Sequence, residues 1–255
     1  MSKSNYLLCV VLSVLGATQA HGATAPAGES VSLPIQSVLM PFEGFDDNDT
    51  VQMVVHGNLP SACYQLGEAK FELKAGRVIE VSQAASHLSD GLCDEEEILP
   101  DYMRMPIPFT SELTLGHLEA GEYRIEFKGG LGIRQVRTLK IGHSDVPTLD
   151  ERFYASVTQV VAPDVIHSGQ DLKVTLIGLY NSDCVGLDSE LGVIVEQEVS
   201  IVLPYLAANA DAECHRELRP FSREVNLGKV TGSHHLIHVR SMNGRGLNHW
   251  VEVLP

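Results

Sequence analysis

Two stretches of the chain decide its fold: residues 53–63, MVVHGNLPSAC, and residues 174–184, VTLIGLYNSDC. Each consists of an apolar run, a glycine and a short loop that ends at a cysteine. A shift of 121 residues superimposes the two stretches and also the next cysteine of each copy. After that cysteine the first copy has nine extra residues, and a shift of 112 aligns residues 108–116 with 220–228. This self-similarity predicts two copies of one structural unit.

Four cysteines follow the N-terminal region: Cys63, Cys93, Cys184 and Cys214. Each copy holds two of them, and both pairs are 30 residues apart. The repeat therefore predicts the disulfides Cys63–Cys93 and Cys184–Cys214 among the three connectivities that four cysteines allow. Each bond would contribute roughly 3–4 kcal/mol by closing a loop of about 31 residues in the unfolded chain.

Period-two alternation and β-branched residues predict seven strands in each copy. They are expected near 35–40, 51–57, 69–74, 77–82, 111–116, 122–128 and 134–141, and near 155–161, 171–178, 191–196, 197–203, 223–228, 234–240 and 248–254. Gly129-Gly130 predicts a hairpin between the last two strands of the first copy. Residues 82–89 and 206–213 are the best candidates for short helices.

The predicted fold class is all-β, with two tandem immunoglobulin-like β-sandwich domains and one intradomain disulfide in each. We expect the domains at residues 30–141 and 152–255, with a linker at 142–151. The bond pattern differs from that of antibody domains, because the only tryptophan is Trp250, near the C-terminus.

The N-terminus has the layout of a secretory signal peptide: Lys3, an apolar run over 6–15, and small residues. Cleavage is expected after Ala20 or Gly22, so residues 1–20 form the leader. The run is shorter than the ~20 residues that a membrane span requires. The sequence thus predicts a secreted or periplasmic protein without a transmembrane anchor.

The formal charge is −15, and loss of Lys3 with the leader makes it −16. Nucleic acid and anionic lipid repel such a protein, so nucleic acid is not an expected partner. The expected partner is a protein of the cell envelope or surface, and no motif indicates a cofactor.

One motif set resembles a known module. Residues 57–63 read GNLPSAC, and residues 113–125 read LTLGHLEAGEYRI. Together with the second cysteine and Pro108-Phe109, they resemble a β-sandwich module of secreted and envelope-associated bacterial proteins. The resemblance covers most of 51–141 and is weaker over 171–254, where Asn181 replaces Pro60 and His235 replaces Tyr123. It implies a fold and an envelope location, and it carries no catalytic residues.

An acidic loop is the first candidate for a specific contact. Asp94, Glu95, Glu96 and Glu97 follow Cys93, within the nine residues that the second copy lacks. Tyr102 and Met103 would add apolar contact area beside these charges. The plain interpretation is a solvated loop. Since the shared fold does not require this loop, it is also our first choice for a partner contact.

Two further clusters contain side chains that can bind metal ions. His234 and His238 lie about 13 Å apart along a strand, too far to share one zinc ion. A partly solvated strand is therefore expected, with His235 and Ile237 facing inward, and no metal site is predicted. Asp46-Asp47-Asn48-Asp49 offers oxygen ligands for Ca²⁺ or forms a solvated turn, and the sequence leaves both open.

The chain contains neither a nucleophile elbow nor a phosphate-binding loop, and all four mature cysteines are expected in disulfides. These observations favour an exported, non-enzymatic binding or adhesion protein that acts through β-sandwich loops. Three alternatives remain: a structural or accessory subunit of an envelope assembly, a protease inhibitor with bait residues near 99–109, and a hydrolase with an unrecognised carboxylate site.

Overall fold

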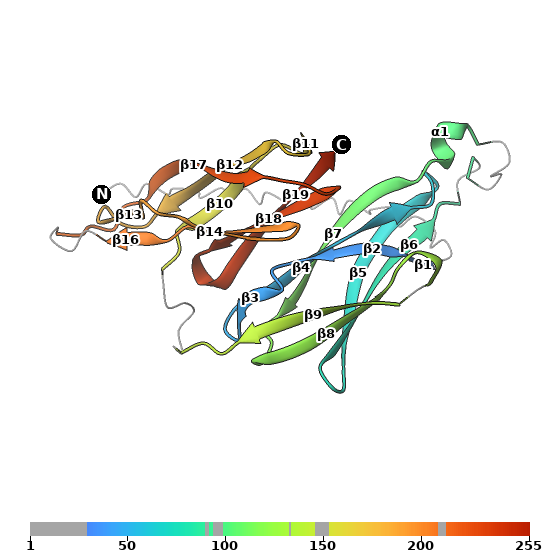
Figure 1. The fold of residues 1–255 in the computed structure, drawn as a ribbon, viewed down its shortest axis with the longest axis horizontal. Coiled ribbons are helices and arrows are strands. Elements are labelled where there is room, and N and C mark those ends of the chain that lie inside the picture. The colour runs from blue at the N-terminus through green and yellow to red at the C-terminus, as the bar shows by residue number, and fades with distance from the viewer. Residues whose placement is uncertain (1–29, 90–91, 94–98, 133, 146–152, 209–212) are drawn as a thin grey trace, which may run out of the picture.

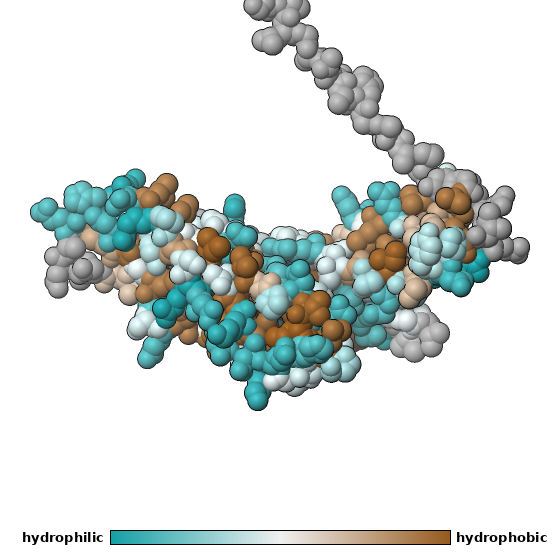
Figure 2. Space-filling view, turned by 90° about the horizontal axis from the view of Figure 1, so that it is seen from above, coloured by the Kyte–Doolittle hydropathy of each residue, from teal (hydrophilic) through white to brown (hydrophobic). Residues whose placement is uncertain are grey.

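The computed structural model describes residues 30–89, 92–93, 99–132, 134–145, 153–208 and 213–255. The fold is all-β, with two β-sandwiches and one disulfide in each, as the sequence predicts (Figure 1). The predicted leader at 1–20 and most of the predicted linker lie outside the described residues. In the space-filling view of Figure 2 the molecule is elongated and slightly curved.

The first sandwich has a sheet of three strands and a sheet of six. The smaller sheet has the order β2 (Ile35–Leu39), β4 (Val51–Leu59), β7 (Ile107–Gly116). The larger sheet has the order β1 (Ser30–Leu33), β6 (Val78–His87), β8 (Gly121–Lys128), β9 (Arg134–Gly142), β3 (Glu43–Asp46), and β5 (Tyr64–Lys74) also pairs with β6.

The second sandwich repeats this plan. Its smaller sheet has the order β10 (Ser156–Val161), β12 (Asp171–Tyr180), β17 (Arg219–Lys229). Its larger sheet has the order β11 (Val165–His167), β19 (Arg245–Leu254), β18 (His234–Ser241), β15 (Val199–Leu203), β14 (Gly192–Glu196). A separate ribbon pairs β13 (Val185–Leu187) with β16 (Leu206–Ala208).

The strand pairings of the two halves correspond. The pairs β6–β8 and β15–β18 are both parallel, as are β3–β9 and β11–β19. The pairs β4–β7 and β12–β17 are both antiparallel, and so are β8–β9 and β18–β19. The repeat found in the sequence is thus a repeat of topology. A central parallel pair in each larger sheet distinguishes this fold from a purely antiparallel sandwich.

Two repeated residues explain part of the sequence match. Gly57 lies opposite Phe109 in the β4–β7 register, and Gly178 lies opposite Phe221 in β12–β17. A Cβ atom on Gly57 would lie 2.8 Å from both the Phe109 ring and the Pro34 carbonyl oxygen. The phenyl ring needs this space in both halves, so glycine and phenylalanine recur together.

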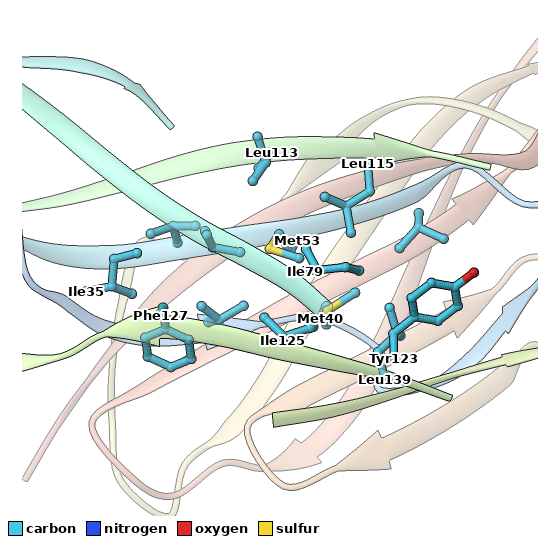
Figure 3. Packing of buried hydrophobic residues seen from close by; sticks show 14 of the residues in the cluster. Ile35, Met40, Met53, Ile79, Leu113, Leu115, Tyr123, Ile125, Phe127 and Leu139 are labelled. Atoms are coloured by element: carbon cyan, nitrogen blue, oxygen red, sulfur yellow. The ribbon is translucent and has the colours of Figure 1, made fainter. Parts of the chain in front are cut away.

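Each sandwich has its own apolar core between its two sheets. Figure 3 shows the first core, where Met53 of β4, Ile79 of β6 and Ile125 of β8 meet. The second core is built by equivalent strands and includes Leu172, Leu176 and Ile237. The alternation of buried and exposed residues along these strands matches the period that predicted them.

Most sequence predictions of secondary structure are confirmed. All fourteen predicted strands overlap observed strands, and β8 and β9 form the predicted hairpin. The predicted helix at 82–89 is wrong: residues 82–87 belong to β6, where Gln83 and Ala85 are buried in alternation. The one at 206–213 is wrong in its first part, which is strand β16, and residues 209–212 lie outside the described residues.

The helical elements that do occur are short. They are α1 (Asp101–Arg104) and the 3-10 turns η2 (Gly130–Gly132) and η3 (Met242–Gly244). Within the described ranges, no helix has the length and apolar character that would let it cross a membrane.

Candidate functional site

The two sandwiches pack on each other through non-equivalent sheets. The outer face of the smaller sheet of the first sandwich, at β2 and β4, meets the outer face of the larger sheet of the second, at β15, β18 and β19. Figure 1 shows the two sandwiches side by side. We call this contact the interface. Its apolar centre contains Leu39 and Val54 from the first sandwich and Val199, Ile201 and Leu236 from the second, with Leu203 and Trp250 at its margin. Four layers of sheet therefore stack in the order large, small, large, small.

A buried ion pair crosses the interface. Arg240 Nη1 of β18 donates to Oδ1 and Oδ2 of Asp49, both at 2.6 Å. The two side chains are 10% and 3% exposed. Asp49 also accepts a hydrogen bond from the backbone N–H of Asp46 at 2.8 Å. Because a buried charge is costly without its partner, this pair ties the two sandwiches together.

Hydrogen bonds continue along one side of the interface. The backbone N–H of Thr50 donates to the Gly244 carbonyl at 3.3 Å, and the Gly246 N–H donates to Gln52 Oε1 at 3.2 Å. The Asn248 side chain donates to Glu112 Oε1 at 3.1 Å. Strand β19 therefore donates hydrogen bonds to the first sandwich while it also belongs to the larger sheet of the second.

Histidines occupy both faces of β18. His235 points into the second core, as predicted, and its Nε2 lies 2.8 Å from the Ser200 hydroxyl. His238 points into the interface, where its Nδ1 lies 2.8 Å from Asn248 Oδ1 and its ring packs against Phe45. Burial lowers the pKa of both histidines to about 4.

The prediction of a partly solvated strand is wrong for β18. His238 is 1% exposed, and Leu236 and Arg240 on the same face are also buried. The reason is the first sandwich, which covers the face that an isolated sandwich would leave in water.

A groove opens at the end of the interface, between β4 and β7 on one side and β18 and β19 on the other. Its volume is about 710 Å³, within the range of small-ligand and peptide sites. Aromatic rings form its floor: His56, His234, Trp250 and Phe109. Polar side chains that line it include Gln36, Thr110, Ser233 and Asn248.

Three rings of the groove stack on one another. The ring centroids of Trp250 and His56 are 4.5 Å apart, and those of Trp250 and His234 are 4.9 Å apart. His56 comes from the first sandwich and the other two from the second, so the groove exists only when the sandwiches are packed. Burial, and then the neighbouring His234, lower the pKa of His56.

The charge of the groove is negative. Asp164 and Glu252 line it, and Asp164 Oδ1 lies 3.5 Å from His249 Nε2. Among the described residues, neither a lysine nor an arginine lines the groove. The groove therefore favours cations, in keeping with the formal charge of −15.

One imidazole of the groove lies between a hydroxyl and a carboxylate. His234 Nδ1 is 2.9 Å from the Ser233 hydroxyl, and His234 Nε2 is 3.3 Å from Glu198 Oε2. An imidazole that lies within hydrogen-bond distance of a hydroxyl can act as its general base. The Nε2 atom has no hydrogen bond among the described residues, so its contact with Glu198 is one of distance alone. Sequence inspection found no nucleophile here, because the three residues match no motif.

The four predicted cysteines form the two predicted bonds. Cys63–Cys93 and Cys184–Cys214 have Cα–Cα distances of 5.4 and 5.3 Å. The first bond has its own apolar cluster with Leu99, against which Met103 packs.

The structure divides the residues of the predicted contact loop. Asp94, Glu95, Glu96 and Glu97 lie outside the described residues. Tyr102 belongs to α1 and is 72% exposed, which leaves it available to a partner. Met103 is half-buried beside the disulfide and its carbonyl accepts a hydrogen bond from the Ala62 N–H at 2.9 Å. Leu99 and Phe109, the ends of the predicted protease bait, are both buried.

Residues 46–49 form a hydrogen-bonded turn whose parts differ in exposure. Asp47 accepts hydrogen bonds from the Ser144 backbone and the His143 ring, and these lower its pKa. The interpretation of a solvated turn fails for Asp49, which is buried by Arg240. Within the described ranges, no group of three or more histidine, cysteine or acidic side chains is arranged to hold a metal ion.

Sequence analysis missed the groove, although a signal for it exists. Val54 and Leu236 are apolar residues at outward-facing positions of strands whose other face fills a core. The single tryptophan occupies a similar outward position on β19. No protein-family model, no curated protein and no solved structure matches the chain, so the geometry alone defines this site.

Proposed function

We propose that this protein is an exported, non-enzymatic binding protein that holds its ligand in the groove between the two sandwiches. The observation that carries the proposal is the aromatic floor of Trp250, His234 and His56, assembled from both sandwiches beneath a 710 Å³ opening. The apolar N-terminal segment and the two disulfides support export to the periplasm or cell surface.

The ligand is a cation with a flat or apolar part. Trp250 offers the strongest aromatic partner for a cation, and Asp164 and Glu252 offer opposite charge at the rim. An arginine side chain meets both conditions, because its guanidinium stacks on aromatic rings and pairs with carboxylates. We therefore propose a basic segment of another envelope or surface protein as the ligand.

Trp250 makes this proposal directly testable, because it is the only tryptophan in the chain. Its emission should change on titration with an oligo-arginine peptide and stay constant with an oligo-glutamate peptide of the same length. The double variant Asp164→Asn/Glu252→Gln should bind oligo-arginine about tenfold more weakly, which corresponds to ~1.4 kcal/mol.

Glu213→Gln/Glu217→Gln is the matched control, since it also removes two charges and both acids are exposed and outside the groove lining. It should bind like the unchanged protein. Equal weakening by both sets of variants would show that net charge attracts the peptide without a site. An emission that ignores both peptides would overturn the proposal.

A second candidate rests on the contacts of His234. The Ser233–His234–Glu198 arrangement favours a hydrolase in which Ser233 is the nucleophile, a role the predicted carboxylate site did not include. Turnover of an ester substrate that Ser233→Ala abolishes, while oligo-arginine binding stays, would establish it. An unreactive Ser233 toward a serine-directed fluorophosphonate would exclude it.

A further inference from the structure

Strand β14 leaves an apolar edge open. It ends the larger sheet of the second sandwich and pairs only with β15 among the described strands. Its three central residues, Val193, Ile194 and Val195, are 37%, 45% and 55% exposed. Alternate residues of an edge strand also turn their N–H and C=O groups to the open side, where another strand can bind them.

Three other edge strands carry devices that discourage pairing, whereas the edge strands β2 and β10 contain neither a proline nor a charge. Strand β5 alternates charges with its apolar residues, at Lys70, Glu72 and Lys74. Strands β7 and β17 each contain a proline near one end, Pro108 and Pro220. Strand β14 has neither a proline nor a charge between Gly192 and Glu196. Natural sheets protect their edges in these ways. Because β14 lacks them and exposes three consecutive apolar side chains, we take its edge as one that binds another strand.

Both faces of β14 continue an apolar layer. Val193 lies beside Val202, which belongs to the second core. Ile194 lies beside Ile201, which belongs to the interface. A strand added at this edge would extend both layers, so its own side chains must be apolar on both faces.

We propose that β14 of a second copy of this chain occupies the edge, antiparallel and about a twofold axis through Ile194. The run is palindromic in character, which supports a second copy over an unrelated strand. In this register Ile194 meets Ile194 of the other copy and Val193 meets Val195. Glu196 meets Gly192, so the strand places no like charges opposite each other.

The two five-stranded sheets would become one continuous sheet across the dimer. Because each copy carries a formal charge of −15, long-range repulsion opposes the association. Added salt screens this repulsion, so the dimer should become tighter as ionic strength rises.

Sedimentation velocity of the full oxidised protein tests the proposal, over a concentration series at 50 and 500 mM NaCl. We expect a monomer–dimer equilibrium that shifts to dimer at the higher salt. Ile194→Lys should give a monomer throughout, because it places two like charges on the axis. Leu179→Lys is the control: Leu179 is 36% exposed on the central strand β12, where it pairs with Ser156 of β10 and Pro220 of β17. A monomer at all concentrations, or a dimer that Ile194→Lys leaves intact, would overturn the proposal.

The register has its own test. Two Cα atoms directly opposite across an antiparallel pair lie at a distance that a disulfide can bridge. Under mild oxidation Ile194→Cys should form a covalent dimer, and Leu179→Cys on the central strand β12 should stay monomeric. Equal cross-linking of both variants would contradict the twofold register. Groove binding does not depend on β14, so either proposal can fail alone.

Discussion

Strands β8 and β18 occupy equivalent places in the two sandwiches and differ on one face. Their inward faces are alike: Tyr123 and Ile125 in β8 correspond to His235 and Ile237 in β18. Their outward faces are not. Strand β8 shows charged residues such as Arg124 to solvent, whereas β18 turns Leu236, His238 and Arg240 toward the first sandwich.

The difference shows how one fold can present either a solvent-exposed sheet or a sheet that packs on a second sandwich. Inward residues maintain the sandwich and are therefore shared, while outward residues decide whether a face is wet or covered. The covered face of β18 packs on the smaller sheet of the first sandwich, not on its own equivalent. Two similar units thus form a single, asymmetric molecule with a groove that neither contains alone.

The largest expected effect comes from breaking the buried ion pair. Asp49→Ala removes the carboxylate that binds the buried Arg240 guanidinium, so unfolding free energy should fall by about 3–5 kcal/mol. Urea denaturation measures this loss. The double variant Asp49→Val/Arg240→Met should recover most of it, because it removes both charges of the pair. A small effect of Asp49→Ala would show that water reaches the pair.

Leu236→Ala should come next. Leu236 is fully buried at the centre of the interface, so its truncation should cost about 2–5 kcal/mol. Urea denaturation of the variant gives the value. A change below 1 kcal/mol would indicate that the face of β18 is open to solvent, as the sequence predicted.

Stability should also depend on pH. The pKa values of His235 and His238 are about 4 in the folded protein and near 6.5 when unfolded. Between these values the unfolded chain binds more protons, so stability falls as pH falls through this window. The urea midpoint should therefore be lower at pH 5 than at pH 7.5.

A paired substitution isolates one of these histidines. His235→Leu/Ser200→Ala removes the ring together with its hydroxyl partner and leaves no unpaired group. This variant should lose part of the pH dependence. An unchanged pH dependence would mean that His235 stays neutral in both states or that other groups dominate.

The smallest effect is expected at an exposed outward position of the equivalent strand in the first sandwich. Glu122→Ala on the outer face of β8 should change stability by less than about 0.5 kcal/mol, since Glu122 is exposed. Urea denaturation beside Leu236→Ala gives the comparison. A cost equal to that of Leu236→Ala would erase the proposed contrast between the two strands.

Sequence reasoning recovered the repeat, the strands and both disulfides, because periodicity, self-similarity and cysteine spacing can all be read directly along the chain. It missed β1, β3, β11, β13 and β16, which have only three or four residues and so show no clear period. It also missed the interface. His234, Leu236 and His238 share one face of β18, and the sequence shows that this face differs from the inward one. Only the packed structure shows that the first sandwich covers this face.

The candidate site was predictable only in part, because it depends on the packing of the two sandwiches. The acidic loop was noticed because the second copy lacks it, which is a difference along the sequence. The groove combines His56 with Trp250, nearly two hundred residues further along the chain, and this proximity follows from the packing of two non-equivalent sheets. A single sequence carries no direct signal for such a contact.

The central claim is that the interface belongs to the folded core of the molecule. Trp250 tests it directly, because its ring lies where the two sandwiches meet. Its emission and the far-ultraviolet circular dichroism should be followed through one urea titration at pH 7.5. Coincident curves are the predicted result, since the sandwiches and the interface would unfold together. A shift of Trp250 emission at lower urea, with the strands still intact, would show two separate sandwiches and contradict the account.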